Sequence, residues 1–243
     1  MILKNWLKEL EYELVQGSLE TEVDEVVYDS RKARPGAVFI CMEGTRVDSH
    51  KFVPDVLKAG VRVIAAERSV EEEMKASGLT EEERSRVTVI RTQDGRRALA
   101  LLSAARFGYA AKRMITIGVT GTKGKTTTTH MIKTILEAAG KKVGMIGTTG
   151  TVIGDKVTPT MNTTPESYEL HKAFLEMAEA GCEYMIMEVS SQGLKMHRVD
   201  GICFDYGIFT NITPDHIGPD EHDSFEEYLY FKTRLLNMCR VGW

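Results

Sequence analysis

The feature that most constrains the fold is a glycine-rich stretch, Gly118-Val-Thr-Gly-Thr-Lys-Gly-Lys-Thr-Thr-Thr-Thr129. An apolar run at residues 114–119 leads into it and predicts a buried strand, while residues 125–139 predict a helix that ends at Gly140. A strand, a glycine-rich turn and a helix in this order favour a site for the phosphates of a nucleotide. The turn presents backbone N–H groups to the phosphates, and glycine lets the backbone come close.

Two side chains in this stretch have predicted roles at such a site. Lys125 would reach the β- and γ-phosphates as a point charge, and Thr126 would place its hydroxyl on Mg²⁺. The general template has glycine five residues before Gly124, but this chain has Val119 there, so the loop is a particular variant of the motif. The alternative interpretation is a chance glycine turn in front of a helix.

Composition excludes several classes of protein. The 243 residues carry a formal net charge of −4, which argues against a sequence-independent grip on nucleic acid. No apolar run approaches membrane-spanning length, and the N-terminal residues lack an apolar signal core, so we expect a cytoplasmic protein. We also expect a monomer. The four cysteines are far apart and form no C-x-x-C pair, which predicts buried free thiols rather than a metal site.

The chain is predicted to contain two units with α/β patterning, residues 1–110 and 111–243. In the first, short apolar runs predict strands at residues 25–28, 37–42, 62–66 and 87–91. Pro35-Gly36 predicts a turn between the first two strands. Helices are expected at residues 52–59 and 96–107.

In the second unit, predicted strands alternate with predicted helices. The strands are expected at residues 114–119, 142–147, 184–189 and 204–210, and the helices at residues 125–139, 164–180 and 224–239. Thr164 is the expected cap of the middle helix, with Pro165 at its first position. This alternation predicts a mostly parallel α/β sheet that binds ligands at the carboxyl ends of its strands.

Three residues beyond the glycine-rich loop could carry chemistry. Glu188 ends an apolar strand, where a carboxylate is costly unless it is paired or metal-bound; an acid that faces water is the alternative. His216 follows the next strand and could be a metal ligand, a polar switch or plain surface. Lys232 has apolar and aromatic neighbours, so it either snorkels from a packed helix or is a functional lysine with a depressed pKa.

Several segments, in order along the chain, resemble one known family, the Mur ligases of peptidoglycan synthesis. The segments are Asp29-Ser-Arg31, Pro35-Gly-Ala-Val-Phe39, Gly121-Thr-Lys-Gly-Lys-Thr126, Asn162-Thr-Thr-Pro165, Met187-Glu-Val-Ser-Ser191, Arg198-Val199 and Phe209-Thr-Asn-Ile-Thr-Pro-Asp-His216. The resemblance covers essentially the whole chain. It implies a small N-terminal α/β domain that binds a UDP-sugar, followed by a partial, mostly parallel α/β central domain of P-loop type that binds ATP.

The resemblance also implies roles for individual residues. Ser30 and Thr45 would contact the UDP-sugar. The ATP phosphates would lie on Gly121, Thr122, Lys123, Gly124, Lys125, Thr126 and Thr127. The muramoyl dipeptide would be bound by Asn162, Thr163, Thr164, Ser190 and Arg198. The implied magnesium ligands are Thr126, Glu188, His216 and Lys232, the lysine carbamylated by CO₂, and the implied catalytic residues are Lys125, Glu188, His216 and Lys232.

The activity that the resemblance implies is ATP-dependent amide ligation. A diamino acid, meso-diaminopimelate or L-lysine, would be joined to UDP-N-acetylmuramoyl-L-alanyl-D-glutamate through an acyl phosphate. The family also has a third domain that binds the amino acid, so we expect this chain to be a truncated piece, inactive by itself. Two alternatives stay open: a non-catalytic module that binds nucleotide or UDP-precursor, and a ligase similar to folylpolyglutamate synthetase.

Overall fold

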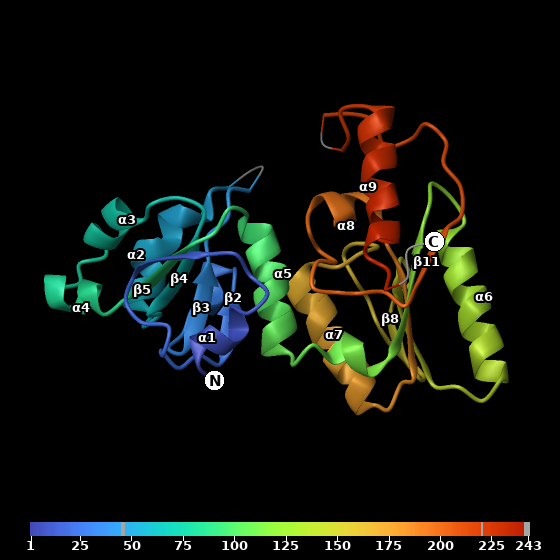
Figure 1. Ribbon diagram of the computed structural model, residues 1–243, viewed down its shortest axis with the longest axis horizontal. Helices are drawn as coiled ribbons and strands as arrows, with labels where there is room; N and C mark the ends of the chain where they lie inside the picture. Colours follow the sequence, from blue (N-terminus) through green and yellow to red (C-terminus); the bar gives the residue numbers. More distant parts are fainter. Residues whose placement is uncertain (45–46, 220, 241–243) are drawn as a thin grey trace. The chain divides into compact units, whose positions relative to one another are not determined.

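The computed structural model describes residues 1–44, 47–219 and 221–240. The chain divides into two compact units, Met1–Arg106 and Phe107–Trp243, each built around its own sheet (Figure 1). Among the described residues, no helix is long and apolar enough to cross a bilayer. The four cysteines are free thiols, but Cys203 is exposed, so the expectation of burial is wrong for that residue.

The N-terminal unit holds a five-stranded sheet in the order β1-β5-β4-β3-β2. Strands β2 to β5 are parallel to their neighbours and confirm the four predicted strands, whereas the edge strand β1 pairs antiparallel with β5 and was not predicted. The bounds are β1 (Glu13–Gln16), β2 (Glu25–Val27), β3 (Ala37–Ile40), β4 (Val63–Ala66) and β5 (Thr88–Arg91).

Helices cover this sheet because successive strand residues face opposite sides. Phe39 and Ile64 pack with Val56 and Met74, from α2 and α3, in one buried cluster. Helix α5 contacts β2, β3 and β4. The helical elements are α1 (Leu3–Trp6), η1 (Ser30–Lys32), η2 (Ser49–Phe52), α2 (Val53–Lys58), α3 (Glu71–Lys75), α4 (Glu81–Ser85) and α5 (Gly95–Arg106).

The C-terminal unit holds a six-stranded sheet in the order β11-β6-β10-β7-β8-β9. Strands β11, β6, β10 and β7 are mutually parallel, which confirms the predicted mostly parallel sheet, and β8 and β9 extend it as an antiparallel hairpin. The bounds are β6 (Ile115–Thr120), β7 (Val143–Gly147), β8 (Gly150–Ile153), β9 (Lys156–Thr158), β10 (Tyr184–Glu188) and β11 (Tyr206–Phe209).

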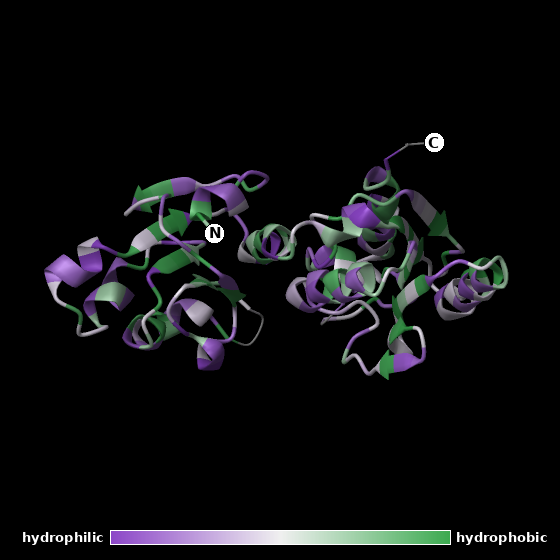
Figure 2. Cartoon of the chain, turned by 90° about the horizontal axis from the view of Figure 1, so that it is seen from below, coloured by the Kyte–Doolittle hydropathy of each residue, from purple (hydrophilic) through white to green (hydrophobic). Residues whose placement is uncertain are grey.

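This second sheet has helices on both faces. Met185 and Met187 of β10 belong to a cluster that includes α7, α8 and α9, whereas Ile186 between them packs toward α6. Hydrophobic residues are concentrated on the strands of both units in Figure 2, as such layers require. The helical elements are η3 (Ala110–Arg113), α6 (Lys125–Ala138), α7 (Ser167–Glu179), α8 (Ser191–Lys195) and α9 (Phe225–Asn237).

The predicted start of α7 is wrong. Its N-cap is Glu166, and neither Thr164 nor Pro165 belongs to the helix. The hydroxyl of Thr164 instead donates to the carbonyl of Glu188 at 3.0 Å and accepts the N–H of Ser190 at 2.9 Å. These two backbone groups lie where β10 ends, and burial there requires partners for them. The need of these two buried backbone groups for hydrogen-bond partners therefore outweighs the local preference of threonine for a helix N-cap.

Candidate functional site

The glycine-rich loop follows β6, which lies between β11 and β10 in the second sheet, and leads into α6 (Figure 1). Gly121 has φ +144°, and a side-chain carbon there would collide with the hydroxyl of Thr210. Gly124 caps α6 in a left-handed conformation, with φ +84°. Val119 is fully buried within β6, so the departure from the general template falls in the strand and leaves the turn itself intact. Both loop glycines are thus required by backbone geometry.

Lys125 is folded back over the loop. Its Nζ donates to the carbonyl oxygens of Gly121 at 2.8 Å and Thr122 at 3.1 Å. Burial lowers the pKa of this amine, while the nearby carboxylates of Glu188 and Asp215 act in the opposite direction. The side chain therefore lies at the turn where phosphates would be held, which agrees with its predicted role.

Glu188 ends β10, the strand beside β6, and is 1% exposed. Its Oε2 accepts the hydroxyl of Thr126 at 3.0 Å, and its Oε1 accepts the backbone N–H of Thr148 at 2.9 Å. A side chain at Gly147 would occupy the space of this carboxylate. The alternative that Glu188 faces water is thus wrong. A carboxylate and a hydroxyl side by side form the hard oxygen set that suits Mg²⁺, so these residues fit that ion.

The contacts of His216 are with residues other than Thr126 and Glu188. It is exposed, it has φ +54°, and its Nδ1 is 2.7 Å from the Oε1 of Glu221. Its ring centroid is 5.8 Å from that of Tyr228. Among the described residues, no hydrogen bond or ion pair joins His216 to Glu188. The metal role predicted for His216 thus has no support from these contacts.

Lys232 lies on α9 and is 1% exposed. Its Nζ donates to the carbonyl of Gly121 at 2.8 Å, the same oxygen that Lys125 contacts, and lies 4.6 Å from the ring centroid of Tyr228. Burial, and then the charge of Lys125, lower the pKa of Lys232 to about 7. The lysine is therefore buried at the phosphate loop. The alternative in which it snorkels from a packed helix to solvent is wrong. Carbamylation stays a prediction.

Asn211 organises the first turn of the loop and was not a predicted site residue. Its carbonyl accepts the N–H of Thr122 at 3.0 Å, its Oδ1 accepts the N–H of Lys123 at 3.0 Å, and its Nδ2 donates to the carbonyl of Lys123. The side chains of Lys123 and Thr127 are exposed. The position of Asn211, two residues after β11 ends, was the signal that could have identified it.

Three residues predicted to bind the dipeptide lie together beside Glu188. Thr164 contacts Ser190 as described above, and Arg198 donates from Nη1 to the carbonyl of Thr164 at 3.0 Å. Arg198 also pairs with Glu166 at 2.6 Å, yet its buried Nε has no hydrogen-bond partner among the described residues. Such a donor suits an anionic ligand group.

The other two residues of this predicted set differ in exposure. The hydroxyls of Thr163 and Thr148 are 3.2 Å apart, which links Thr163 to the residue whose N–H binds Glu188. Asn162 is exposed. Thr148 was not predicted, although it directly follows the end of β7, where parallel sheets bind ligands.

In the N-terminal unit, Ser30 opens η1 three residues after the end of β2 and is half-buried. The preceding Asp29 accepts the N–H of Arg31 at 3.1 Å and pairs with its guanidinium, which fixes this turn. Thr45 lies outside the described residues. The position of Ser30 at the carboxyl end of a parallel strand agrees with a binding role, and that role remains a prediction.

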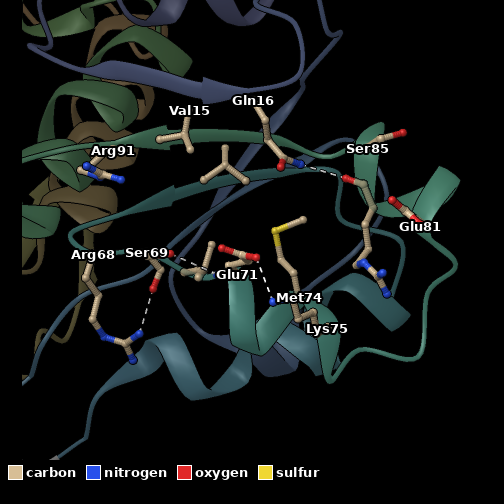
Figure 3. A pocket seen from close by; sticks show the side chains of 13 residues that line it. Val15, Gln16, Arg68, Ser69, Glu71, Met74, Lys75, Glu81, Ser85 and Arg91 are labelled. Carbon is tan, nitrogen blue, oxygen red and sulfur yellow. Dashed lines mark hydrogen bonds and ion pairs between the residues drawn. The ribbon is translucent and has the colours of Figure 1, made fainter.

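The same unit contains a cavity of about 360 Å³ bordered by β1, β5, α3 and α4 (Figure 3). Its floor includes Val70, Met74 and Val89. At its rim, Arg68 is paired with Glu73, and Arg91 is paired with Glu13. None of its lining residues is a predicted site residue.

Two protein-family models match this chain. Residues 119–242 match the family described as "Mur ligase middle domain", and residues 22–107 match "Mur ligase family, catalytic domain". The UDP-N-acetylmuramoyl-L-alanyl-D-glutamate--2,6-diaminopimelate ligase of Clostridium perfringens is 44% identical over 97% of this chain and 46% of its own length. The enzyme of the same name from Geobacillus thermodenitrificans is 44% identical over 82% of this chain and 38% of its own length.

Solved structures share the fold. A structure of a UDP-N-acetylmuramoyl-L-alanyl-D-glutamate--2,6-diaminopimelate ligase superposes with a TM-score of 0.77 at 22% identity, over 98% of this chain and 46% of that one. The MurF ligase of Thermotoga maritima in complex with ADP gives 0.54 at 22% identity, over 90% of this chain and 44% of that one. The chain spans about half the length of the curated relatives it matches. On these family matches and identities, the chain belongs to the Mur ligase family.

Proposed function

We propose that this chain contributes the nucleotide-binding and precursor-binding parts of an ATP-dependent ligase that joins 2,6-diaminopimelate to UDP-N-acetylmuramoyl-L-alanyl-D-glutamate. The observation that carries the proposal is the contact between Thr126 and Glu188 beside Lys125, at the end of a loop built for phosphates. The names of relatives at 44% and 41% identity favour this reaction over folate ligation.

In this proposal, each side chain acts through charge or position. Lys125 neutralises phosphate charge, and the oxygens of Thr126 and Glu188 would hold Mg²⁺, which supplies further neutralisation during phosphoryl transfer. The γ-carboxylate of the dipeptide would be phosphorylated by ATP and then attacked by the amine of the acceptor. Arg198 would orient the anionic precursor with its Nε–H, which has no hydrogen-bond partner in the part of the chain that the structure describes.

Lys232 completes the proposed site. Its amine, buried and with a pKa lowered to about 7, is available in neutral form to react with CO₂, and the carbamate would add an anionic oxygen donor. Incubation with ¹³C-bicarbonate followed by ¹³C NMR tests this step. A carbamate resonance that disappears in Lys232→Arg supports it, and a spectrum without that resonance contradicts it.

Binding and turnover are tested separately. Calorimetry with Mg·ATP and with UDP-N-acetylmuramoyl-L-alanyl-D-glutamate should give binding of both ligands, and failure to bind Mg·ATP would overturn the proposed site. A coupled assay with both ligands and diaminopimelate then distinguishes an enzyme from a non-catalytic binding module. We expect the 243-residue polypeptide by itself to form no tripeptide, and product formation would refute that expectation.

A further inference from the structure

Tyr228 of α9 contacts the phosphate loop directly. Its hydroxyl donates to the Oγ1 of Thr122 at 3.0 Å, across 106 positions of the sequence. The side chain is fully buried. Burial raises the pKa of the phenol, so the hydroxyl keeps the proton that this hydrogen bond requires.

The hydroxyl of Thr122 is saturated by protein groups. Its Oγ1 donates to the carbonyl of Thr213 at 3.3 Å and accepts the N–H of Thr213 at 3.0 Å, and Tyr228 provides the third bond. A hydroxyl has one proton and two lone pairs, so this set uses its whole capacity. The side chain of Thr122 is therefore committed to holding the loop and has no proton left for a phosphate.

The ring of Tyr228 is fixed on several sides. The rings of His222 and Phe225 lie with centroids 5.3 and 6.4 Å from it, and the amine of Lys232 lies over its face. Tyr228 and Lys232 are four residues apart and share one face of the helix. Together they contact two consecutive loop residues, Thr122 and Gly121.

We propose that Tyr228 is a positioning residue for the phosphate loop: its hydroxyl joins α9 to Thr122 and holds the loop against the segment that contains Thr213. The inference rests on the proposed nucleotide site and adds to it a residue whose hydroxyl is hydrogen-bonded to the loop side chain of Thr122. Its physical basis is that a buried hydrogen bond between distant segments fixes their separation, which a nucleotide would otherwise have to impose on binding.

The test compares Tyr228→Phe with Tyr230→Phe in the 243-residue chain. Both changes remove one phenolic oxygen from α9, but Tyr230 is 61% exposed and is the matched control. Amide hydrogen exchange, measured by NMR without any ligand, reports on the N–H groups of Thr122 and Thr213. We expect Tyr228→Phe to speed exchange at both amides about two- to tenfold, as loss of one net hydrogen bond implies, with no change in Tyr230→Phe.

Mg·ATP binding gives the second readout. Tyr228→Phe should raise the Kd about two- to tenfold, and the same change made in a Thr122→Val background should have no further effect, because the bond is already absent. Unchanged exchange at Thr122 and Thr213 in Tyr228→Phe would overturn the inference, as would an equal effect of that change in both backgrounds. Absence of Mg·ATP binding in the parent chain would refute the proposed function instead, and the exchange comparison would still decide the role of Tyr228.

Discussion

Thr126 donates its hydroxyl to the Oε2 of Glu188 at 3.0 Å, which joins the first turn of α6 to the end of β10. The two residues are 62 positions apart in the sequence. Parallel pairing of β6 with β10 places the carboxyl ends of both strands at one edge, with Glu188 opposite Val119 in the register. The contact therefore follows from sheet topology, and it creates the oxygen pair on which the proposed metal site depends.

Glu188→Gln should remove the Mg²⁺-dependent part of ATP affinity. The amide keeps the shape and can still accept the N–H of Thr148, but it lacks the charge that attracts the cation. We expect at least about tenfold weaker binding of ATP in Mg²⁺, the lower limit for losing a charged interaction, and little change in EDTA. Calorimetry in both conditions measures this. Glu183→Gln, an exposed acid paired with Lys141, is the control, and equal Mg²⁺ dependence in both variants would contradict the metal role.

Lys125→Ala should weaken ATP binding by about 1.5–3 kcal/mol, since it removes a charge-assisted contact to the phosphates. The matched control is Lys133→Ala on the same helix, where the lysine pairs with Glu137. Fluorescence titration with a labelled ATP analogue gives both dissociation constants. Equal affinities for the two variants would show that Lys125 does not reach the nucleotide.

Lys232→Met should change how stability depends on pH. The pKa of Lys232 is lowered from 10.5 to about 7 by burial, so between these values the unfolded chain carries a proton that the folded chain has released. This group therefore makes the free energy of unfolding rise with pH across that window. The destabilisation caused by burying the protonated amine is greatest below pH 7. The stability of the variant relative to the parent should fall steadily from pH 7 to pH 10. Urea denaturation at several pH values measures it, and parallel curves would disprove the shift.

Asp48→Asn should destabilise the N-terminal unit at neutral pH and less so in acid. Burial of Asp48 would raise its pKa, but hydrogen bonds from Arg68 and His50 outweigh that effect and hold the pKa well below its usual value. The stabilisation is present above the ordinary pKa near 3.8 and is lost as pH falls toward the lowered value. Urea midpoints at pH 7 and pH 2.5 should show a difference from the parent that narrows in acid. Asp155→Asn, in the exposed turn after β8, should show no such trend.

Three missed strands show where sequence patterns were too short to predict an element. Strands β8 and β9 have only four and three residues, yet the Gly154-Asp155 dipeptide between them is a recognised hairpin signal. Strand β1 is four residues long and lies at a sheet edge, and Leu14 and Val15 within it are both exposed. A strand that buries few side chains shows little of the alternation between apolar and polar residues by which strands are recognised in a sequence.

Features that depend on neighbouring residues could be predicted from the amino-acid sequence. The glycines of the phosphate loop, the parallel strands on both sides of it and the position of Lys125 all follow from local turn chemistry and from the alternation of apolar runs with helical segments. The apolar neighbours of Lys232 were likewise visible in the sequence, but they left its burial undecided, because the amine is buried against the distant loop at Gly121.

Which polar atoms meet depends instead on the packing of distant segments in the folded chain. Thr164 leaves the helix it was expected to cap and satisfies the end of β10, Tyr228 reaches Thr122 from a distant helix, and the carbonyl of Gly121 receives both Lys125 and Lys232. Local propensities differ by about 1 kcal/mol, whereas a buried polar group without a partner costs about 1–3 kcal/mol. Long-range hydrogen bonding therefore overrides local preference wherever the fold brings such groups together out of water.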